Sequence, residues 1–242
     1  ADDQIAPDTT DVVVRRKMLM ENRNRKAGRK GNTIIDAQIG VDRDTQLRLI
    51  IDEATNNVLE ANGEADLNVT IDSANGDLEI RGDYQISEGF YNFNFQNLIG
   101  KRFTISPDSY IRWNGSPLDA AIDIDAVYKV KTSLAPLLGT EVSASRGSTP
   151  VECIVNLGGS LADIDLSFDI NVPTANAEYQ SILSSYFSSQ EMMATQFVYL
   201  LALGNFHSDS STEQTNTPGA AGTAIGLDFL ASQVSKLVSN DA

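Results

Sequence analysis

Apolar and polar side chains alternate along most of the chain between residues 32 and 172. The alternation is clearest in Leu78–Ile86 and Ala120–Val130, where every second residue is aliphatic, aromatic or glycine and most residues between them are charged or polar. Successive side chains of a β-strand point to opposite faces, so a period of two gives each strand one apolar face and one polar face. The pattern therefore predicts a sheet built from many amphipathic strands.

Short turns separate these predicted strands. Asn75-Gly76 is the strongest example, because asparagine and glycine tolerate the positive φ angles of a tight hairpin turn. Short connections favour strands that pair with their neighbours in sequence, which makes the sheet antiparallel. One segment is ambiguous: in Phe90–Phe95 both phases contain aromatic residues, so the pattern does not decide which side chains face inward.

The period changes from two to 3.6 after Pro173, which predicts helices in the C-terminal part. Thr174 or Asn176 is expected to cap the first helix, and Ser188 with Glu191 has the spacing of a capping box for the second. We predict three regions from these changes: a linker over residues 1–31, a β domain over residues 32–172, and a helical segment over residues 173–242. The helical segment contains a Ser/Thr/Asn/Gly-rich loop at residues 208–219 that we expect to be flexible.

The charge of the chain limits the partners that it can take. The 242 residues carry a net charge of −15, but residues 1–30 net +3 and the remainder nets −18. So acidic a body repels the phosphate backbone of nucleic acids, and we expect no nucleic-acid partner. No run approaches the roughly 20 apolar residues of a membrane-spanning helix.

Candidate catalytic and metal-binding residues form no recognisable constellation. The single histidine, His207, lies beside the polar loop, and the single cysteine, Cys153, is expected to be a small buried residue. Several aspartates alternate with apolar residues, which is typical of a solvent-facing strand surface rather than of a calcium site. These aspartates are Asp123, Asp125, Asp163, Asp165 and Asp169. We predict no catalytic residues, no metal, no cofactor and no enzymatic activity.

The apolar faces of the predicted strands admit two interpretations. They either meet each other in a closed sandwich or barrel, or they line an open groove for hydrocarbon. For the groove, the predicted lining residues are Leu67, Val69, Ile71, Leu78, Ile80, Tyr84, Ile86, Ile122, Ile124, Ala126, Ile164, Leu166 and Phe168.

Three segments in order, Gly82–Phe93, Arg102–Ile105 and Ile111–Ala120, resemble the C-terminal domain of the TamB family, and Val151–Leu203 is similar to it as well. The resemblance implies a mostly β fold: an elongated antiparallel sheet curled into an open hydrophobic trough (a β-taco), with C-terminal α-helices. It also implies kinship with AsmA-like bridge proteins, which are linked to phospholipid movement toward the outer membrane.

What the resemblance implies about function has two forms. In the first, the chain is part of a periplasmic envelope protein that shields phospholipid acyl chains and acts with an outer-membrane barrel of the BamA/TamA type. In the alternative, a domain that binds no lipid docks to that barrel by β-augmentation for protein assembly or secretion. Both place the chain in the periplasm as a fragment, anchored to the inner membrane by a segment that it lacks, reaching the outer membrane. Membrane contact is then a property of the full-length protein. A secreted or surface adhesion domain is a third interpretation.

Overall fold

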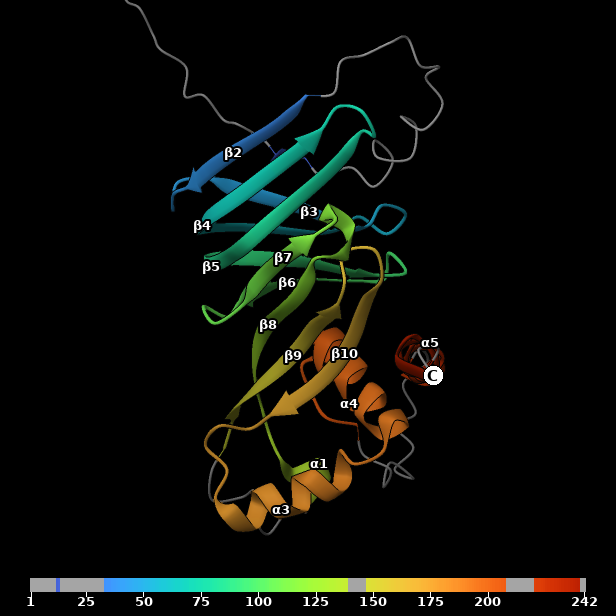
Figure 1. Cartoon of the computed structure of the whole chain (residues 1–242). Helices are drawn as coiled ribbons and strands as arrows, with labels where there is room; N and C mark the ends of the chain where they lie inside the picture. Colours follow the sequence, from blue (N-terminus) through green and yellow to red (C-terminus); the bar gives the residue numbers. More distant parts are fainter. Residues whose placement is uncertain (1–11, 14–32, 139–146, 208–219, 240–242) are drawn as a thin grey trace, which may run out of the picture. The chain divides into compact units, whose positions relative to one another are not determined.

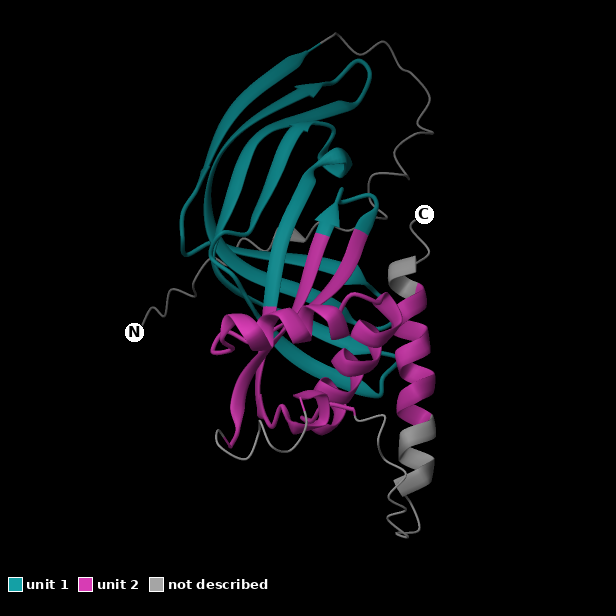
Figure 2. Ribbon diagram, turned by 90° about the horizontal axis from the view of Figure 1, so that it is seen from below, with its two compact units in different colours: residues 1–126, 158–164 teal, residues 127–157, 165–242 magenta. Residues whose placement is uncertain are grey.

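The computed structural model describes residues 12–13, 33–138, 147–207 and 220–239, in two compact units. Unit 1 comprises residues 1–126 and 158–164, and unit 2 comprises residues 127–157 and 165–242 (Figure 2). The predicted flexible loop lies outside the described residues. So does the predicted linker, apart from the two-residue strand β1 (Val12–Val13), which pairs in parallel with a strand of unit 1.

Unit 1 is a curved sheet of strands that pair antiparallel, apart from the parallel contact of β1 (Figures 1 and 2). Its strands are β2 (Ile34–Val41), β3 (Gln46–Asp52), β4 (Asn57–Asp72), β5 (Asp77–Phe95), β6 (Ile99–Ile105), β7 (Tyr110–Gly115) and the first part of β8 (Ala121–Thr132). A short 3₁₀ turn, η2 (Pro117–Asp119), joins β7 to β8.

The long strands β4 and β5 are each shared by two shorter partners. The first half of β4 pairs with β3 and its second half pairs with β2. The first half of β5 pairs with β7 and its second half pairs with β6. Two regions of sheet therefore share the same central hairpin, one with β3 and β6 and the other with β2 and β7 (Figure 1).

A β-bulge in β5 settles the ambiguous aromatic segment. Asn62 and Gly63 of β4 face Glu88 and Ile86, so Ser87 is an extra residue in β5. An extra residue shifts the alternation by one position. The apolar side chains are therefore even-numbered before the bulge and odd-numbered after it.

The shift buries one aromatic phase and exposes the other. Tyr91, Phe93 and Phe95 are buried, whereas Phe90 is exposed on the opposite face, where the guanidinium of Arg102 lies 3.7 Å from its ring centroid. Because of the bulge, one face of β5 stays apolar along all of its 19 residues.

The described residues of unit 2 form the rest of β8, two further strands and four helices. The strands are β9 (Thr149–Gly159) and β10 (Ile164–Asn171), and both β8 and β9 pass from one unit into the other. The helices are α1 (Ala135–Leu138), α3 (Ala177–Tyr186), α4 (Gln190–Leu203) and α5 (Ala220–Ser239).

The helix caps agree with the sequence to within one residue. The Asn176 side chain accepts a hydrogen bond from the Tyr179 amide at the start of α3, at 2.9 Å. Helix α4 is capped by Ser189, one residue after the predicted Ser188, and ends at Gly204 with a left-handed φ of 71°.

The predicted fold class is confirmed: the chain is mostly β, with a large antiparallel sheet and helices in its C-terminal part. The curl of the whole sheet into an open trough stays a prediction. In the described part of the chain, every helix is too short or too polar to span a lipid bilayer.

Candidate functional site

One face of the unit 1 sheet is apolar across successive strands. The register places Ile71 of β4 between Ile35 of β2 and Leu78 of β5. In the next row of the same face, Val69 lies between Ala37 and Ile80. These rows continue into the region that contains β3 and β6, so the face is one surface with two parts.

The part that contains β3 and β6 is closed. Leu59, Tyr91 and Phe103 lie opposite one another on β4, β5 and β6, and each is fully buried. The Phe93 ring meets the Phe103 ring edge-on, with 5.7 Å between their centroids. This packing is that of an ordinary protein core.

The part that contains β2 and the adjoining ends of β4 and β5 is open, whereas Ile111 of β7 and its partner Tyr84 are buried. Ile35, Ile39 and Ile71 expose 50%, 45% and 40% of their surface, although they belong to the same apolar face as the closed part. Four further apolar side chains beside them are only half-buried. We call the seven residues the open face: Ile35, Ile39, Leu67, Val69, Ile71, Leu78 and Ile80.

The predicted lining residues divide between these two parts and strand β10. Leu67, Val69, Ile71, Leu78 and Ile80 belong to the open face. A second group, which shares the same face, is buried: Tyr84, Ile86, Ile122, Ile124 and Ala126. On β10, Ile164, Leu166 and Phe168 are half-buried. Sequence reasoning missed Ile35 and Ile39, although both alternate with Asp36 and Gln38 at the start of the predicted β domain.

Within unit 2, the protein itself covers the apolar side of the strands. The Phe168 ring lies 4.8 Å from the Phe197 ring of α4, which is fully buried. The Gln196 side chain, in the middle of α4, holds the segment that follows the helix by donating to the His207 carbonyl at 3.1 Å and accepting from the His207 amide at 2.8 Å. Leu166 and Phe168 thus belong to strand β10, which packs against α4.

The sequence does contain a signal for this role of α4. Five consecutive residues, 197–201, are apolar or aromatic, and all are buried. A helix that is apolar on every side is typical of a helix buried between other elements.

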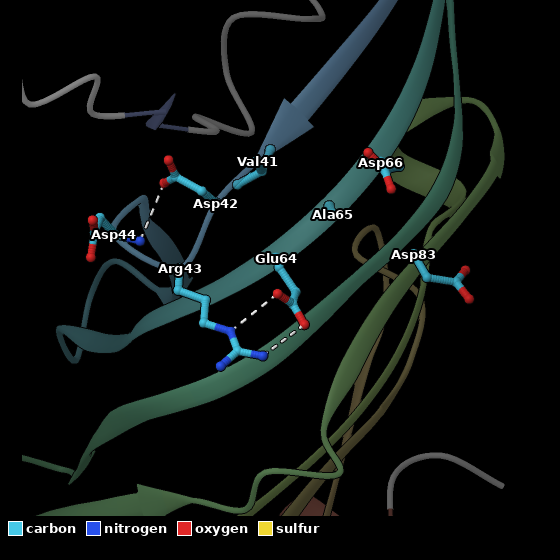
Figure 3. Close-up of a pocket in the computed structure, with 8 residues that line it drawn as sticks. All are labelled: Val41, Asp42, Arg43, Asp44, Glu64, Ala65, Asp66 and Asp83. Atoms are coloured by element: carbon cyan, nitrogen blue, oxygen red, sulfur yellow. Dashed lines mark hydrogen bonds and ion pairs between the residues drawn. The ribbon is translucent and has the colours of Figure 1, made fainter.

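The loop after β2, together with β4 and β5, borders a hollow that is lined mainly by charged residues (Figure 3). The Arg43 guanidinium donates to both carboxylate oxygens of Glu64, at 3.1 and 3.2 Å. These hydrogen bonds lower the pKa of Glu64. Asp83, which points away from that pair in Figure 3, accepts two hydrogen bonds from Arg112 at 2.8 and 3.0 Å, and its pKa is also lowered. Both basic residues are therefore neutralised by neighbouring carboxylates.

The side chains that could act as nucleophiles or metal ligands show no arrangement for catalysis or metal binding in the described part of the chain. Burial raises the pKa of Cys153 to about 12, so its thiol stays protonated at neutral pH. Among the described residues, no three His, Cys, Asp or Glu side chains come together in a way that could hold a metal ion. The open face itself consists of aliphatic side chains.

The closed part contains a buried hydroxyl without a partner, which yields a stability prediction. The Tyr91 hydroxyl is fully buried and makes no hydrogen bond with any residue that the structure describes, whereas the Tyr84 hydroxyl donates to the Ala61 carbonyl at 3.3 Å. An unpaired buried hydroxyl costs about 1–3 kcal/mol. We expect Tyr91→Phe to raise the free energy of unfolding by up to about 1 kcal/mol, and the matched variant Tyr84→Phe to lower it by about 1 kcal/mol, in urea titrations.

Tyr91 also makes the stability of the protein depend on pH. Burial raises the pKa of Tyr91 in the folded state, with a smaller contribution from Asp52, whereas an unfolded tyrosine titrates near pH ~10. The stability contribution of this group is therefore complete below pH ~10 and is lost as the pH rises further. The alkaline loss is expected to be smaller in Tyr91→Phe; an unchanged or lower stability of this variant at neutral pH would contradict the assignment of an unpaired hydroxyl.

Comparison with known families gives one match. A model of the TamB C-terminal domain matches residues 2–241. No curated protein matches the chain.

Proposed function

The chain belongs to the TamB C-terminal domain family, and from that premise we propose that the open face shields phospholipid acyl chains during their transport toward the outer membrane. The TamB family is a transport and assembly module of the bacterial cell envelope. We propose that this chain works there without catalysis, in the periplasm, as part of a longer protein anchored to the inner membrane. Its partner is an outer-membrane barrel of the BamA/TamA type.

The observation that supports the lipid role is the open face itself. Isoleucine side chains at 40–50% exposure lie in the first and third of three successive apolar rows of one sheet face, next to a part of the same face that is fully packed. Contiguous apolar surface on a soluble protein marks a binding site more often than not. Each methylene group removed from water contributes roughly 0.8 kcal/mol. A lipid with two acyl chains removes many methylene groups from water when it covers such a surface, so its binding there is favourable.

The composition of the open face also suits a conduit. All seven side chains are aliphatic, and they recur at each step along β4 and β5. An acyl chain therefore meets the same kind of contact in successive rows. Such a surface holds hydrocarbon without fixing it at one position, which lets a lipid slide.

A charge at the centre of the open face tests this proposal. We expect Val69→Asp to reduce the phospholipid bound by the purified protein about tenfold, because a carboxylate in contact with hydrocarbon loses its hydration. Bound lipid is measured by mass spectrometry after incubation with dioleoyl phospholipid in mixed micelles. The matched control is Asn68→Asp, which adds the same charge on the neighbouring residue of β4, facing the other side of the sheet.

Ile39→Asp provides a second variant at a more exposed position of the open face, so that a folding defect at Val69 does not decide the outcome. Urea titrations establish that each variant is folded. Equal lipid binding by Val69→Asp, Ile39→Asp and Asn68→Asp would contradict the proposal. So would the absence of lipid from the unmodified protein.

The alternative, docking by β-augmentation, is favoured by strand β2. In the described part of the chain β2 pairs with β4 alone, and it contains no proline, no lysine and no bulge. Such an unprotected edge is a template for an added strand. The Ser73 amide donates to the Thr33 carbonyl at 3.0 Å, which fixes the alternation of the ladder. Odd-numbered residues of β2 bond to β4, and even-numbered residues direct their N–H and C=O groups toward the free edge.

Proline substitutions distinguish the two sides of β2. We expect Gln38→Pro to weaken binding to the barrel partner at least tenfold, because it removes an outward N–H group, with little loss of stability. Ala37→Pro removes an inward N–H group and is expected to destabilise the sheet instead. Gln38→Ala keeps the N–H group and serves as control. Pulldown of the barrel partner measures docking, and unchanged binding by Gln38→Pro would exclude this edge.

A further inference from the structure

We propose that the open face selects phospholipids whose headgroup carries no net negative charge. This inference rests on the proposed lipid function and adds a class of substrate to it. Zwitterionic headgroups, in which an ammonium group balances the phosphate, are the predicted ligands. Lipids with a net anionic headgroup are predicted to be disfavoured.

The charge balance of unit 1 is the first observation. Its residues 33–126 and 158–164 contain eighteen Asp and Glu but only six Lys and Arg. The potential around the unit is therefore strongly negative, and such a field acts on charged ligands before they make contact. Residues 1–30 net +3, which leaves the whole chain at −15.

The second observation is where the acidic residues lie. Asp42 and Asp44 follow β2 at one end of the open face. Asp72 and Asp77 face each other in register at the opposite end, where β4 turns into β5. A headgroup whose acyl chains lie on the open face must emerge near one of these ends. Either exit brings it close to carboxylates.

The third observation is that the basic residues nearby are already paired. Arg43 binds Glu64, Arg112 binds Asp83, and Arg81 donates to Glu79 at 3.0 Å. Arg48 lies 3.5 Å from Glu60. Each of these pairs is neutral as a whole, so it does little to attract a phosphate group. The carboxylates at the two ends keep their effect.

Coulomb's law gives the size of the discrimination. One carboxylate about 8 Å from a net negative headgroup in water lowers its binding roughly twofold, before screening by salt. The two carboxylates near an exit therefore lower it about fourfold. A zwitterionic headgroup largely escapes this effect because its own charges cancel. The discrimination should fade at high ionic strength, where the screening length is a few ångströms.

Two lipids with identical acyl chains test the inference. The full chain is incubated with mixed micelles of dioleoyl phosphatidylethanolamine and dioleoyl phosphatidylglycerol in equal amounts, with a chelator present so that divalent cations do not bridge charges. Bound lipid is quantified by mass spectrometry. We expect about fourfold more of the ethanolamine lipid at about 20 mM salt, and nearly equal amounts of the two lipids at about 500 mM salt.

Charge-neutralising variants localise the effect. Asp44→Asn combined with Asp77→Asn, one at each end of the open face, removes one carboxylate from each exit and is expected to raise the share of phosphatidylglycerol about twofold at low salt. Glu53→Gln combined with Glu88→Gln makes the same change in net charge near the closed part, and it is expected to have a smaller effect. Equal effects of both pairs would overturn the assignment to the ends of the open face.

The outcomes separate this inference from the proposed function. Equal binding of both lipids, independent of salt, would overturn the charge selection while leaving the lipid function intact. Preference for phosphatidylglycerol would also overturn it. Binding of neither lipid would contradict the proposed function itself.

Discussion

Replacing Gly82 with alanine is expected to lower the free energy of unfolding by roughly 2–5 kcal/mol. Two independent costs combine at this residue of β5. Its φ of +138° is a conformation that residues with a Cβ atom rarely adopt, which costs roughly 1–3 kcal/mol. A Cβ atom there would also collide with the Asp66 carbonyl oxygen and lie 3.0 Å from the Leu67 side chain. Overpacking of this kind costs about 1–3 kcal/mol.

Alanine substitutions at other glycines of unit 1 measure the backbone cost and the crowding cost separately. Gly115 has a φ of +143° but open space around it, so Gly115→Ala should show the backbone cost alone. Gly89 has an ordinary φ but lies too close to Glu60, whose carbonyl oxygen would be 2.6 Å from the new Cβ atom, so Gly89→Ala should show the crowding cost alone. Gly100 has neither constraint, and Gly100→Ala should be nearly neutral.

Urea titrations of the four alanine variants measure these differences. The expected order of destabilisation places Gly82→Ala first, Gly89→Ala and Gly115→Ala between, and Gly100→Ala last. A Gly82→Ala variant as stable as Gly100→Ala would mean that β4 and β5 do not approach as closely as the structure places them.

Phe197→Ala is the second large expected effect, a loss of about 3–5 kcal/mol in unit 2. The Phe197 side chain is fully buried in α4, and its ring lies against Phe168 of β10. Truncation leaves a cavity between helix and strands and removes the aromatic contact. The helical circular-dichroism signal during urea titration reports the loss.

Phe229→Ala is the matched control for this variant. Phe229 is also a helical phenylalanine, but 58% of its surface is exposed on α5, so its truncation should change stability by less than about 0.5 kcal/mol. A Phe197→Ala variant no less stable than Phe229→Ala would show that α4 does not pack on the strands in solution.

The period-two pattern was sufficient to predict the strands, because it depends only on the direction of successive side chains. It could not predict the bulge at Ser87, since both phases of the following segment are aromatic and either would have given an apolar face. The one-residue difference between Ser188 and Ser189 as the cap of α4 has a similar origin, because both serines can accept the same kind of hydrogen bond.

The sequence pattern predicted which residues form the apolar face of the sheet. It did not predict which part of that face is exposed. Leu59 and Val69 occupy equivalent positions on the same face of β4, and nothing in their local sequence distinguishes the buried residue from the half-buried one. The difference arises from which strand lies across from each half of β4, which is a tertiary property. The predicted lipid role of the lining residues stays a prediction.

The sharing of β4 and β5 between the two parts of unit 1 has a mechanical consequence. The hydrogen-bonded ladder between β4 and β5 runs from the packed aromatic residues to the Asp72–Asp77 pair at the far end. The exposed region is therefore held in place by strands that are anchored in the closed part. A lipid bound on this surface, as proposed above, would leave it without breaking the backbone hydrogen bonds of the strands beneath. The surface is therefore expected to keep its form with or without a ligand.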